Sequence, residues 1–196
     1  MKQTMIAPMP TGEATIGPFF PGAYVDVAAN DLTSLKGRDA AGQVIEIRGR
    51  VTQEDGAPLA NVIIEIWQAD ASGIFKHPAD PRSMDADPNF FGWGRAATAA
   101  DGQYLFRTIM PGRSPMRTGP ARAPHINMVV LASGLMRQLQ TVMFFDGDAA
   151  NATDVVLASV KPAELRAALI GKADGPGRYR FDIRLRGEGE TPFFED

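Results

Sequence analysis

Apolar and polar residues alternate with period two along most of this chain, and the pattern becomes regular at Val44. From there Ile45, Ile47 and Val51 are interleaved with charged residues, as in a strand with one wet face and one face on a core. The run 62–67 (VIIEIW) is apolar on both faces. It is therefore predicted to be a more central strand than the first one.

Later stretches repeat this pattern. Residues 98–108 predict a hairpin with an Asp-Gly tip, and 139–145 predict a further strand. Unbroken alternation over 179–186 predicts the last strand. Residues 162–170 start with proline and have a following glycine as a stop signal, which predicts the only helix. Short strands separated by turn residues, with one short helix near the C-terminus, indicate a mainly β fold, an antiparallel β-sandwich with long loops.

The first 40 residues have prolines and glycines too closely spaced for long regular elements. We therefore expect two parts, an N-terminal arm over 1–40 and a β-sandwich domain over 41–196. The arm contains Phe19, Phe20 and Tyr24, whose exposure would cost about 25 cal/mol per Å² of apolar area. The arm is thus expected to lie on its own sandwich or on a partner subunit.

Composition excludes several function classes. With 196 residues, 44% hydrophobic and 22% charged, the chain is typical of one globular domain with extensions. Its lack of cysteine excludes thiolate chemistry and fits a reducing compartment, so a cytoplasmic location is expected. A net charge of −3 provides no basic field, and we expect neither nucleic acid nor a membrane as partner. The first 20 residues lack a continuous apolar run and predict neither a signal peptide nor a membrane span.

The strand predicted over 123–132 contains the most suggestive chemistry. His125 and Asn127 are two residues apart, so their side chains are expected on one face. A His-x-His pair at this spacing would offer two metal ligands, but asparagine is a poor ligand. Two interpretations of His125 stay open, a half-buried imidazole bonded to backbone or a metal ligand. His77, the other histidine, is expected to be solvated in a loop.

Other candidate ligands give weaker predictions. The loop aspartates Asp80, Asp85 and Asp87 could chelate a hard cation, but they lack the spacing of an EF-hand, and a solvated loop is expected. Tyr104 and Tyr179 alternate with polar residues and are expected in the core. No phosphate-binding glycine loop, HExxH or GxSxG motif occurs. From the residues alone, the chain has no complete catalytic set.

Several motifs between residues 11 and 196 carry a resemblance to a known family. They are TIGPFF at 15–20, VIIEIWQADASG at 62–73, DPNFFGWGR at 87–95, DGQYLFRTIMPG at 101–112, APHINMVV at 123–130 and YRFDIRLRGEGETPFFED at 179–196. In this combination the chain resembles the intradiol ring-cleaving dioxygenases, and most closely the alpha chain of a two-chain member. The resemblance implies an oxidoreductase subunit that takes part in cleaving a small aromatic substrate between two hydroxyl groups with dioxygen.

The same resemblance has implications for the metal. In the catalytic beta chain of such enzymes, two tyrosines and both histidines of a His-x-His strand bind non-haem ferric iron. Here the first tyrosine falls near Arg82, the second falls at Ser114, and the histidines become His125 and Asn127. Since ferric iron needs anionic oxygen donors, Ser114, His125 and Asn127 are expected to be vestigial metal positions. This chain would then have no metal and no catalytic residue, with Fe(3+) in a partner beta chain of an alpha-beta hetero-oligomer.

By the same resemblance, this chain adds residues to the partner's substrate pocket. The positions are Thr15, Gly17 and Pro18 in the arm, where glycine permits close approach to a ligand and proline stiffens the backbone. The family often has an arginine just before the glycine that ends the His125 strand, but this chain has Ser133 there, with Arg137 as a substitute candidate.

Two alternatives remain open at this point: a self-sufficient metalloenzyme that uses His125 and loop carboxylates, or an iron-free β-sandwich module that binds other proteins without a catalytic partner.

Overall fold

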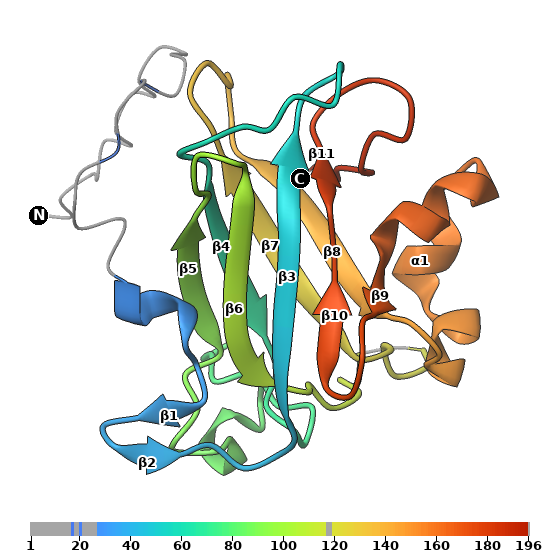
Figure 1. Ribbon diagram of the computed structural model, residues 1–196. Helices are drawn as coiled ribbons and strands as arrows, with labels where there is room; N and C mark the ends of the chain where they lie inside the picture. The colour runs from blue at the N-terminus through green and yellow to red at the C-terminus, as the bar shows by residue number, and fades with distance from the viewer. Residues whose placement is uncertain (1–16, 18–19, 21–26, 117–118, 196) are drawn as a thin grey trace, which may run out of the picture.

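The computed structural model describes residues 17, 20, 27–116 and 119–195. Two stacked β layers form the body of the described chain, with helical turns along one side (Figure 1). The alternation seen in the sequence accounts for the layers, because each strand turns its apolar side inward. A small two-stranded ladder lies below the body and consists of β1 (Ser34–Leu35) and β2 (Arg38–Asp39).

The first layer is organised around the long strand β3 (Val44–Thr52), as the sequence predicts. Along β3 buried and more exposed residues alternate, with Ile45, Ile47 and Val51 all within 1% of full burial. Its neighbours in this layer are β6 (Gln103–Ile109), antiparallel to it, and β10 (Arg178–Arg180) and β11 (Ile183–Arg184), both parallel to it.

The second layer contains the strand predicted to be more central. β4 (Ile63–Gln68) pairs antiparallel with strands on both sides, and the layer continues through β7 to β8. Short strand β9 (Ile170–Ala173) joins the layers by pairing with β8 and β10. The remaining strands of this layer are β5 (Trp93–Ala97), β7 (His125–Leu131) and β8 (Leu139–Phe145).

Two apolar clusters stabilise this arrangement. The main one fills the space between the layers and includes Ile47, Ile66, Phe106, Ile126 and Met128. The smaller one lies on the opposite face of β8, where Phe144 packs with residues of two helical segments. These segments are α1 (Val155–Ser159) and the 3-10 helix η5 (Ala163–Leu169), which Figure 1 shows beside β8 and β9. Further 3-10 turns are η2 (Val27–Asn30), η3 (Ser83–Asp85) and η4 (Ala149–Thr153).

Three predictions about the elements need correction. The predicted hairpin over 98–108 has its tight turn, since Ala99 N donates to Gln103 O at 2.9 Å, but β5 pairs with β4 and β6 pairs with β3. The turn therefore carries the chain from one layer to the other. The helix predicted over 162–170 is a 3-10 helix. The α-helix over Val155–Ser159 was not predicted.

The last predicted strand, 179–186, is also interrupted. Phe181 turns inward and is 1% exposed, and the chain pairs with β3 before and after it as β10 and β11. Because these pairings and that of β9 with β8 are parallel, the sandwich is largely rather than wholly antiparallel. Tyr104 lies in the core as predicted, whereas Tyr179 is half-buried and packs edge-on against Phe145 at 4.9 Å between ring centroids.

The segment after residue 26 packs on the sandwich although it belongs to the predicted arm. Leu32 is 7% exposed, and its backbone N–H donates to Arg107 O at 2.8 Å. Gly94 on β5 makes this possible, since a side-chain carbon there would lie 2.5 Å from Leu32 Cδ1. The aromatic residues Phe19 and Tyr24 lie outside the described residues. The boundary at residue 40 stays a prediction.

No helix in the described ranges is both long and apolar enough to cross a membrane.

Candidate functional site

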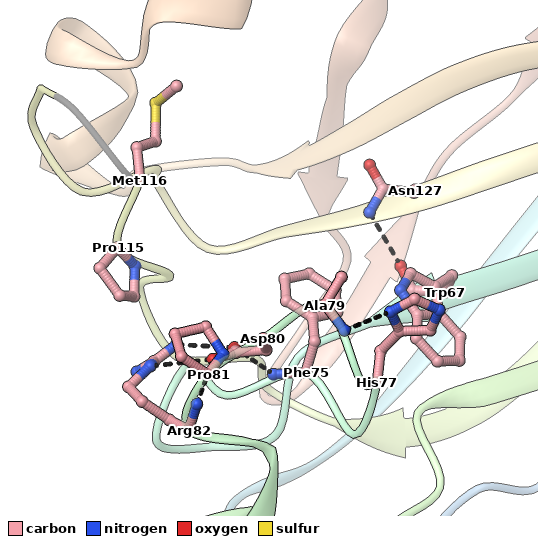
Figure 2. A pocket seen from close by; sticks show the side chains of 10 residues that line it. All are labelled: Trp67, Phe75, His77, Ala79, Asp80, Pro81, Arg82, Pro115, Met116 and Asn127. Carbon is pink, nitrogen blue, oxygen red and sulfur yellow. Dashed lines mark hydrogen bonds and ion pairs between the residues drawn. The ribbon is translucent and has the colours of Figure 1, made fainter.

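A pocket of about 620 Å³ opens on the outer face of the second layer, next to the first residues of β7. It lies where β4 and β7 pair, with Trp67 directly opposite Asn127 in the antiparallel register. The loop after β4 and the loop before β7 form its other walls (Figure 2). Its lining residues are Trp67, Phe75, His77, Ala79, Asp80, Pro81, Arg82, Pro115, Met116 and Asn127.

One wall of the pocket is aromatic. The rings of Trp67 and Phe75 are nearly parallel, with 18° between their planes and 6.1 Å between centroids. His77 meets Trp67 edge-on at 6.0 Å, and its Nδ1 accepts a hydrogen bond from Ala79 N at 3.1 Å. His77 is exposed, as predicted for a loop histidine, but it also lines the pocket, which the sequence analysis missed.

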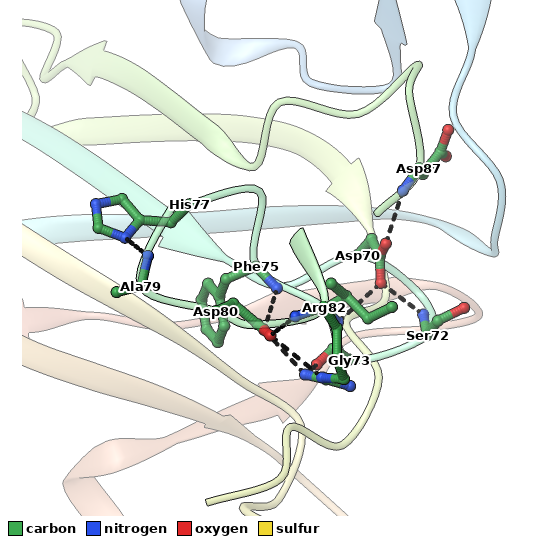
Figure 3. A network of polar contacts seen from close by, with 10 residues as sticks. Asp70, Ser72, Gly73, Phe75, His77, Ala79, Asp80, Arg82 and Asp87 are labelled. Atoms are coloured by element: carbon green, nitrogen blue, oxygen red, sulfur yellow. Dashed lines mark hydrogen bonds and ion pairs between the residues drawn. The ribbon is translucent and has the colours of Figure 1, made fainter. Parts of the chain in front are cut away.

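An ion pair between Arg82 and Asp80 lines the pocket on the side formed by the loop after β4. Arg82 donates from Nη2 to Asp80 Oδ2 at 2.9 Å and from Nε to Oδ1 at 3.2 Å, and Nη2 also reaches Gly73 O (Figures 2 and 3). Burial alone would raise the pKa of Asp80, but hydrogen bonds from the backbone N–H groups of Arg82 and Phe75 and from the Arg82 guanidinium hold it below its ordinary value. The Asp80 side chain is only 11% exposed, so the prediction of a solvated carboxylate is wrong here.

Asp70 holds the long loop that carries this wall. Its Oδ1 accepts from Ser72 N at 2.9 Å and from Ile74 N at 3.0 Å, and its Oδ2 accepts from Asp87 N at 2.9 Å (Figure 3). Asp87 in turn accepts from Ala41 N at 2.7 Å, so both carboxylates are structural. The sequence analysis did not single out Asp70, although an aspartate after a strand and before Ser-Gly is a typical turn former.

His125 lies beneath the aromatic wall rather than in it. It is 4% exposed and lies between the rings of Phe75 and Phe144, at 6.3 and 6.0 Å. Its Nδ1 donates to Ala123 O at 2.7 Å, since a carbonyl can only accept. Burial, reinforced by the positive charge of Arg122, lowers its pKa below the ordinary value, so the ring is neutral near pH 7. Of the two open interpretations, this geometry is that of a buried imidazole bonded to backbone.

A second ion pair fixes the entry to β7. Asp154 is 1% exposed, and its Oδ2 accepts from Arg122 Nε at 2.7 Å and from Ala123 N at 2.9 Å. Its Oδ1 accepts from Val156 N and Leu157 N at 3.0 Å each, capping α1. Burial opposes ionisation of Asp154, but these hydrogen bonds keep its pKa below the ordinary value. Nothing in the sequence analysis pointed to this pair, whose members lie 32 residues apart.

The predicted metal positions gather around this pocket without forming a ligand set. Arg82 and Asn127 line it, and Ser114, which is 5% exposed, adjoins the lining residue Pro115. Asn127 Nδ2 donates to Trp67 O at 3.3 Å, and Arg82 places a cation near the position at which the resemblance puts the first tyrosine. In the ranges that the structure covers, no three His, Cys, Asp or Glu side chains form a group suited to a metal. This donor set does not fit ferric iron, which needs anionic oxygen ligands.

Of the predicted substrate-pocket residues, only Gly17 and Ser133 lie within the described residues. Thr15 and Pro18 lie outside the described residues, whereas Gly17 is described and exposed. Ser133 is exposed just after the end of β7 and does not line the pocket. Arg137 is engaged with Glu195 at 2.5 Å. The roles of these residues stay predictions.

Comparison with known proteins identifies the family. The family model described as "Dioxygenase" matches residues 16–187. The chain is 35% identical to the protocatechuate 3,4-dioxygenase alpha chain of Pseudomonas putida, over 94% of this chain and 96% of the relative. It is 36% identical to the alpha chain from Burkholderia cepacia with the same coverage. It is also 37% identical to the Burkholderia cepacia beta chain, but over 83% of this chain and 74% of that relative.

Solved structures agree. The dioxygenase domain of a dioxygenase and carbohydrate-binding protein fusion from Streptomyces sp. SirexAA-E aligns with a TM-score of 0.60 and 27% identity, over 91% of this chain and 99% of that one. Catechol 1,2-dioxygenase from Acinetobacter sp. ADP1 aligns at 0.63 and 24% identity, over 85% and 60%, and shows the shared fold. The chain therefore belongs to the intradiol ring-cleavage dioxygenase family, as its sequence motifs predicted.

Proposed function

We propose that this chain is the iron-free alpha subunit of a protocatechuate 3,4-dioxygenase. The assembled enzyme would use dioxygen to cleave protocatechuate to 3-carboxy-cis,cis-muconate, with Fe(3+) bound by a beta chain. The observation that carries this proposal is the residue set at and beside the pocket: serine and asparagine stand at two of the four expected iron positions, and a third position falls near Arg82. End-to-end similarity to two alpha chains supports it, because the beta-chain match, though slightly higher in identity, covers less of either chain.

In this proposal the chain contributes its arm and its interfaces. Thr15, Gly17 and Pro18 would approach the beta chain's substrate pocket, and Ser133 would stand where the family often has an arginine. The serine cannot pair with a substrate carboxylate as a guanidinium can. A cytoplasmic location is part of the same proposal, supported by the absence of cysteine.

Expression with and without a beta chain tests this function. The chain alone should purify without stoichiometric iron and without ring-cleaving activity. Co-expression with a beta chain should yield a hetero-oligomer that binds iron, shows the visible band of tyrosinate bound to ferric iron and cleaves protocatechuate. A red, active homo-oligomer would establish the self-sufficient metalloenzyme instead. Two chains that elute separately, each inactive, would favour the interaction module without a catalytic partner.

Deletion of residues 1–18 from the assembled enzyme tests the arm. The KM for protocatechuate should rise while iron per beta chain and the hetero-oligomer stay unchanged. An unchanged KM in an intact, iron-loaded assembly would remove the substrate-pocket role of Thr15, Gly17 and Pro18.

A further inference from the structure

The first layer has a cavity of its own, with a volume of about 370 Å³. It opens on the outer face of this layer, where Figure 1 shows β3 between β6 and β10. Its polar lining consists of three arginines, two aspartates and one glutamine, which are Arg48, Arg50, Arg180, Asp174, Asp182 and Gln103. We propose that this cavity binds inorganic phosphate. The proposal goes beyond the proposed function and does not depend on it, because none of these residues lines the pocket beside β7.

The register of the strands brings the arginines together. Arg48 and Arg50 lie on the outer face of β3, since they alternate with the buried residues Ile47 and Val51. On β10, Arg180 is directly opposite Arg48 in the parallel register. Like charges that face each other on adjacent strands repel, so this array raises the free energy of the folded chain unless an anion lies between the guanidinium groups.

Acidic neighbours compensate these arginines only in part. Glu46 Oε1 accepts from Arg48 Nε at 2.6 Å, and Asp182 Oδ2 accepts from Arg180 Nε and Nη2 at 2.9 and 2.8 Å. Arg50 is exposed, and its guanidinium has no hydrogen-bond or ion-pair partner in the part of the chain that the structure describes. A guanidinium has five N–H donors in a fork that matches the oxygens of phosphate, so all three arginines keep donors for a ligand.

Asp182 belongs to the framework of the cavity. Its Oδ1 accepts from Arg50 N at 3.0 Å, and the carbonyl of the preceding residue, Phe181, accepts from the buried Tyr104 hydroxyl. Gly49 permits the second hydrogen bond, because a side-chain carbon there would lie 1.8 Å from Phe181 O and 2.6 Å from Tyr104 Oη. The Asp182 carboxylate is thus held on the sheet, and an anion can bind without displacing it.

The remaining acceptors distinguish phosphate from other anions. Gln103 Nε2 donates to Asp101 Oδ2 at 2.6 Å, which leaves Oε1 as an acceptor. Asp174 lies within electrostatic reach of the arginines: a hydrogen bond to Asp182, together with the charges of Asp182 and Asp174, raises the pKa of Arg180 above its ordinary value. Near pH 7 phosphate retains a P–OH group that can donate to such acceptors. Sulfate has no proton to donate and would be repelled by the Asp174 carboxylate.

Calorimetric titration of the full chain at pH 7.5 and constant chloride concentration tests the site. Inorganic phosphate should bind saturably, with one site per chain. Sulfate carries at least as much charge but should bind about tenfold more weakly, because it lacks the P–OH donor. Methyl phosphate, a monoester with a second pKa of about 6, has lost this proton at pH 7.5 and should resemble sulfate. The proposal is overturned if phosphate does not bind saturably, or if sulfate or methyl phosphate binds as tightly.

Variants of one arginine locate the site. Arg50→Gln should weaken phosphate binding about tenfold through loss of a charged donor, whereas Arg38→Gln, the same change at an exposed arginine of β2, should not alter it. Arg50→Lys keeps the charge without the fork and should weaken binding severalfold, which decides the location even if Arg50→Gln fails to fold. Phosphate binding that is unchanged in a folded Arg50 variant overturns the assignment to this cavity.

Asp174→Ala tests the acceptor. Because it removes both the repulsion of sulfate and one acceptor for the P–OH group, it should narrow the preference for phosphate over sulfate to within about threefold. An equal gain in affinity for both anions would show that Asp174 only repels them, and would overturn its role in selecting phosphate.

Discussion

Two arginine–aspartate pairs lie near β7, the strand that bears His125 and Asn127, and they have different roles. Arg122 and Asp154 are buried, with side chains 15% and 0% exposed, and they join the entry of β7 to the start of α1. Arg82 and Asp80 are 34% and 11% exposed and form the floor of the pocket. The first pair holds the fold around His125. The second lies near the predicted position of the first iron-binding tyrosine and supplies the charged side chains of the pocket.

The largest effect is expected from removing the acceptor of the buried pair. Asp154→Ala leaves the Arg122 guanidinium without its partner and removes the cap of α1, which should lower the free energy of unfolding by about 3–5 kcal/mol. Urea unfolding measures this. Asp154→Asn keeps one acceptor oxygen and should lose less. Equal stability of Asp154→Ala and the parent chain would show that the pair does not hold the fold.

Removing Asp80, the acceptor of the pocket pair, should lower the free energy of unfolding by less than removing Asp154. Asp80→Ala frees Phe75 N, Arg82 N and the guanidinium near the surface, and should lower the free energy of unfolding by about 1–2 kcal/mol. Urea unfolding measures this change. Equal stability of Asp80→Ala and the parent chain would show that Asp80 does not hold the loop that lines the pocket.

The pH dependence of the free energy of unfolding tests the role of the buried His125, which lies outside the pocket lining. Burial lowers the pKa of His125 below its ordinary value of 6.5, so its contribution to stability is complete above pH 6.5 and is lost as pH falls towards the folded-state pKa. One such group changes the free energy of unfolding by at most about 1.4 kcal/mol per pH unit. Unfolding midpoints between pH 7.5 and 5 should fall less steeply in His125→Gln. Identical slopes would refute this assignment.

The exposed ion pair between Arg137 and Glu195 is expected to contribute least to stability among the three pairs. Arg137 and Glu195 are 69% and 77% exposed, so Arg137→Ala should change the free energy of unfolding by less than about 0.5 kcal/mol. The same variant, placed in the hetero-oligomer, tests Arg137 as the substitute for the arginine missing at position 133. A several-fold rise in KM with unchanged chain stability would support that role, and an unchanged KM would dismiss it.

The pattern of apolar and polar residues was sufficient to predict a strand wherever that strand has one solvent-exposed face or two buried faces. Ile45 and Ile47 predicted β3, and the apolar run before Gln68 predicted a central strand. Both predictions depend only on the face of the strand to which each side chain points. The turn at Gly102 was also correctly anticipated. The partners of the strands on either side of it were not, because pairing depends on which distant strand presents a free edge.

The sequence by itself determined the family, since membership depends on residue identity in motifs spread over most of the chain, and it predicted the loss of the metal set from asparagine at 127 and serine at 114. Only the tertiary structure decided that Arg82, Trp67 and Asn127 share one open pocket, that Asp154 supports the strand bearing His125, and that Asp80 is bound rather than solvated. The first two of these join segments tens of residues apart, whereas Asp80 is held by neighbours within five residues. Their free energy arises from desolvation and from hydrogen bonds that exist only once the layers have packed.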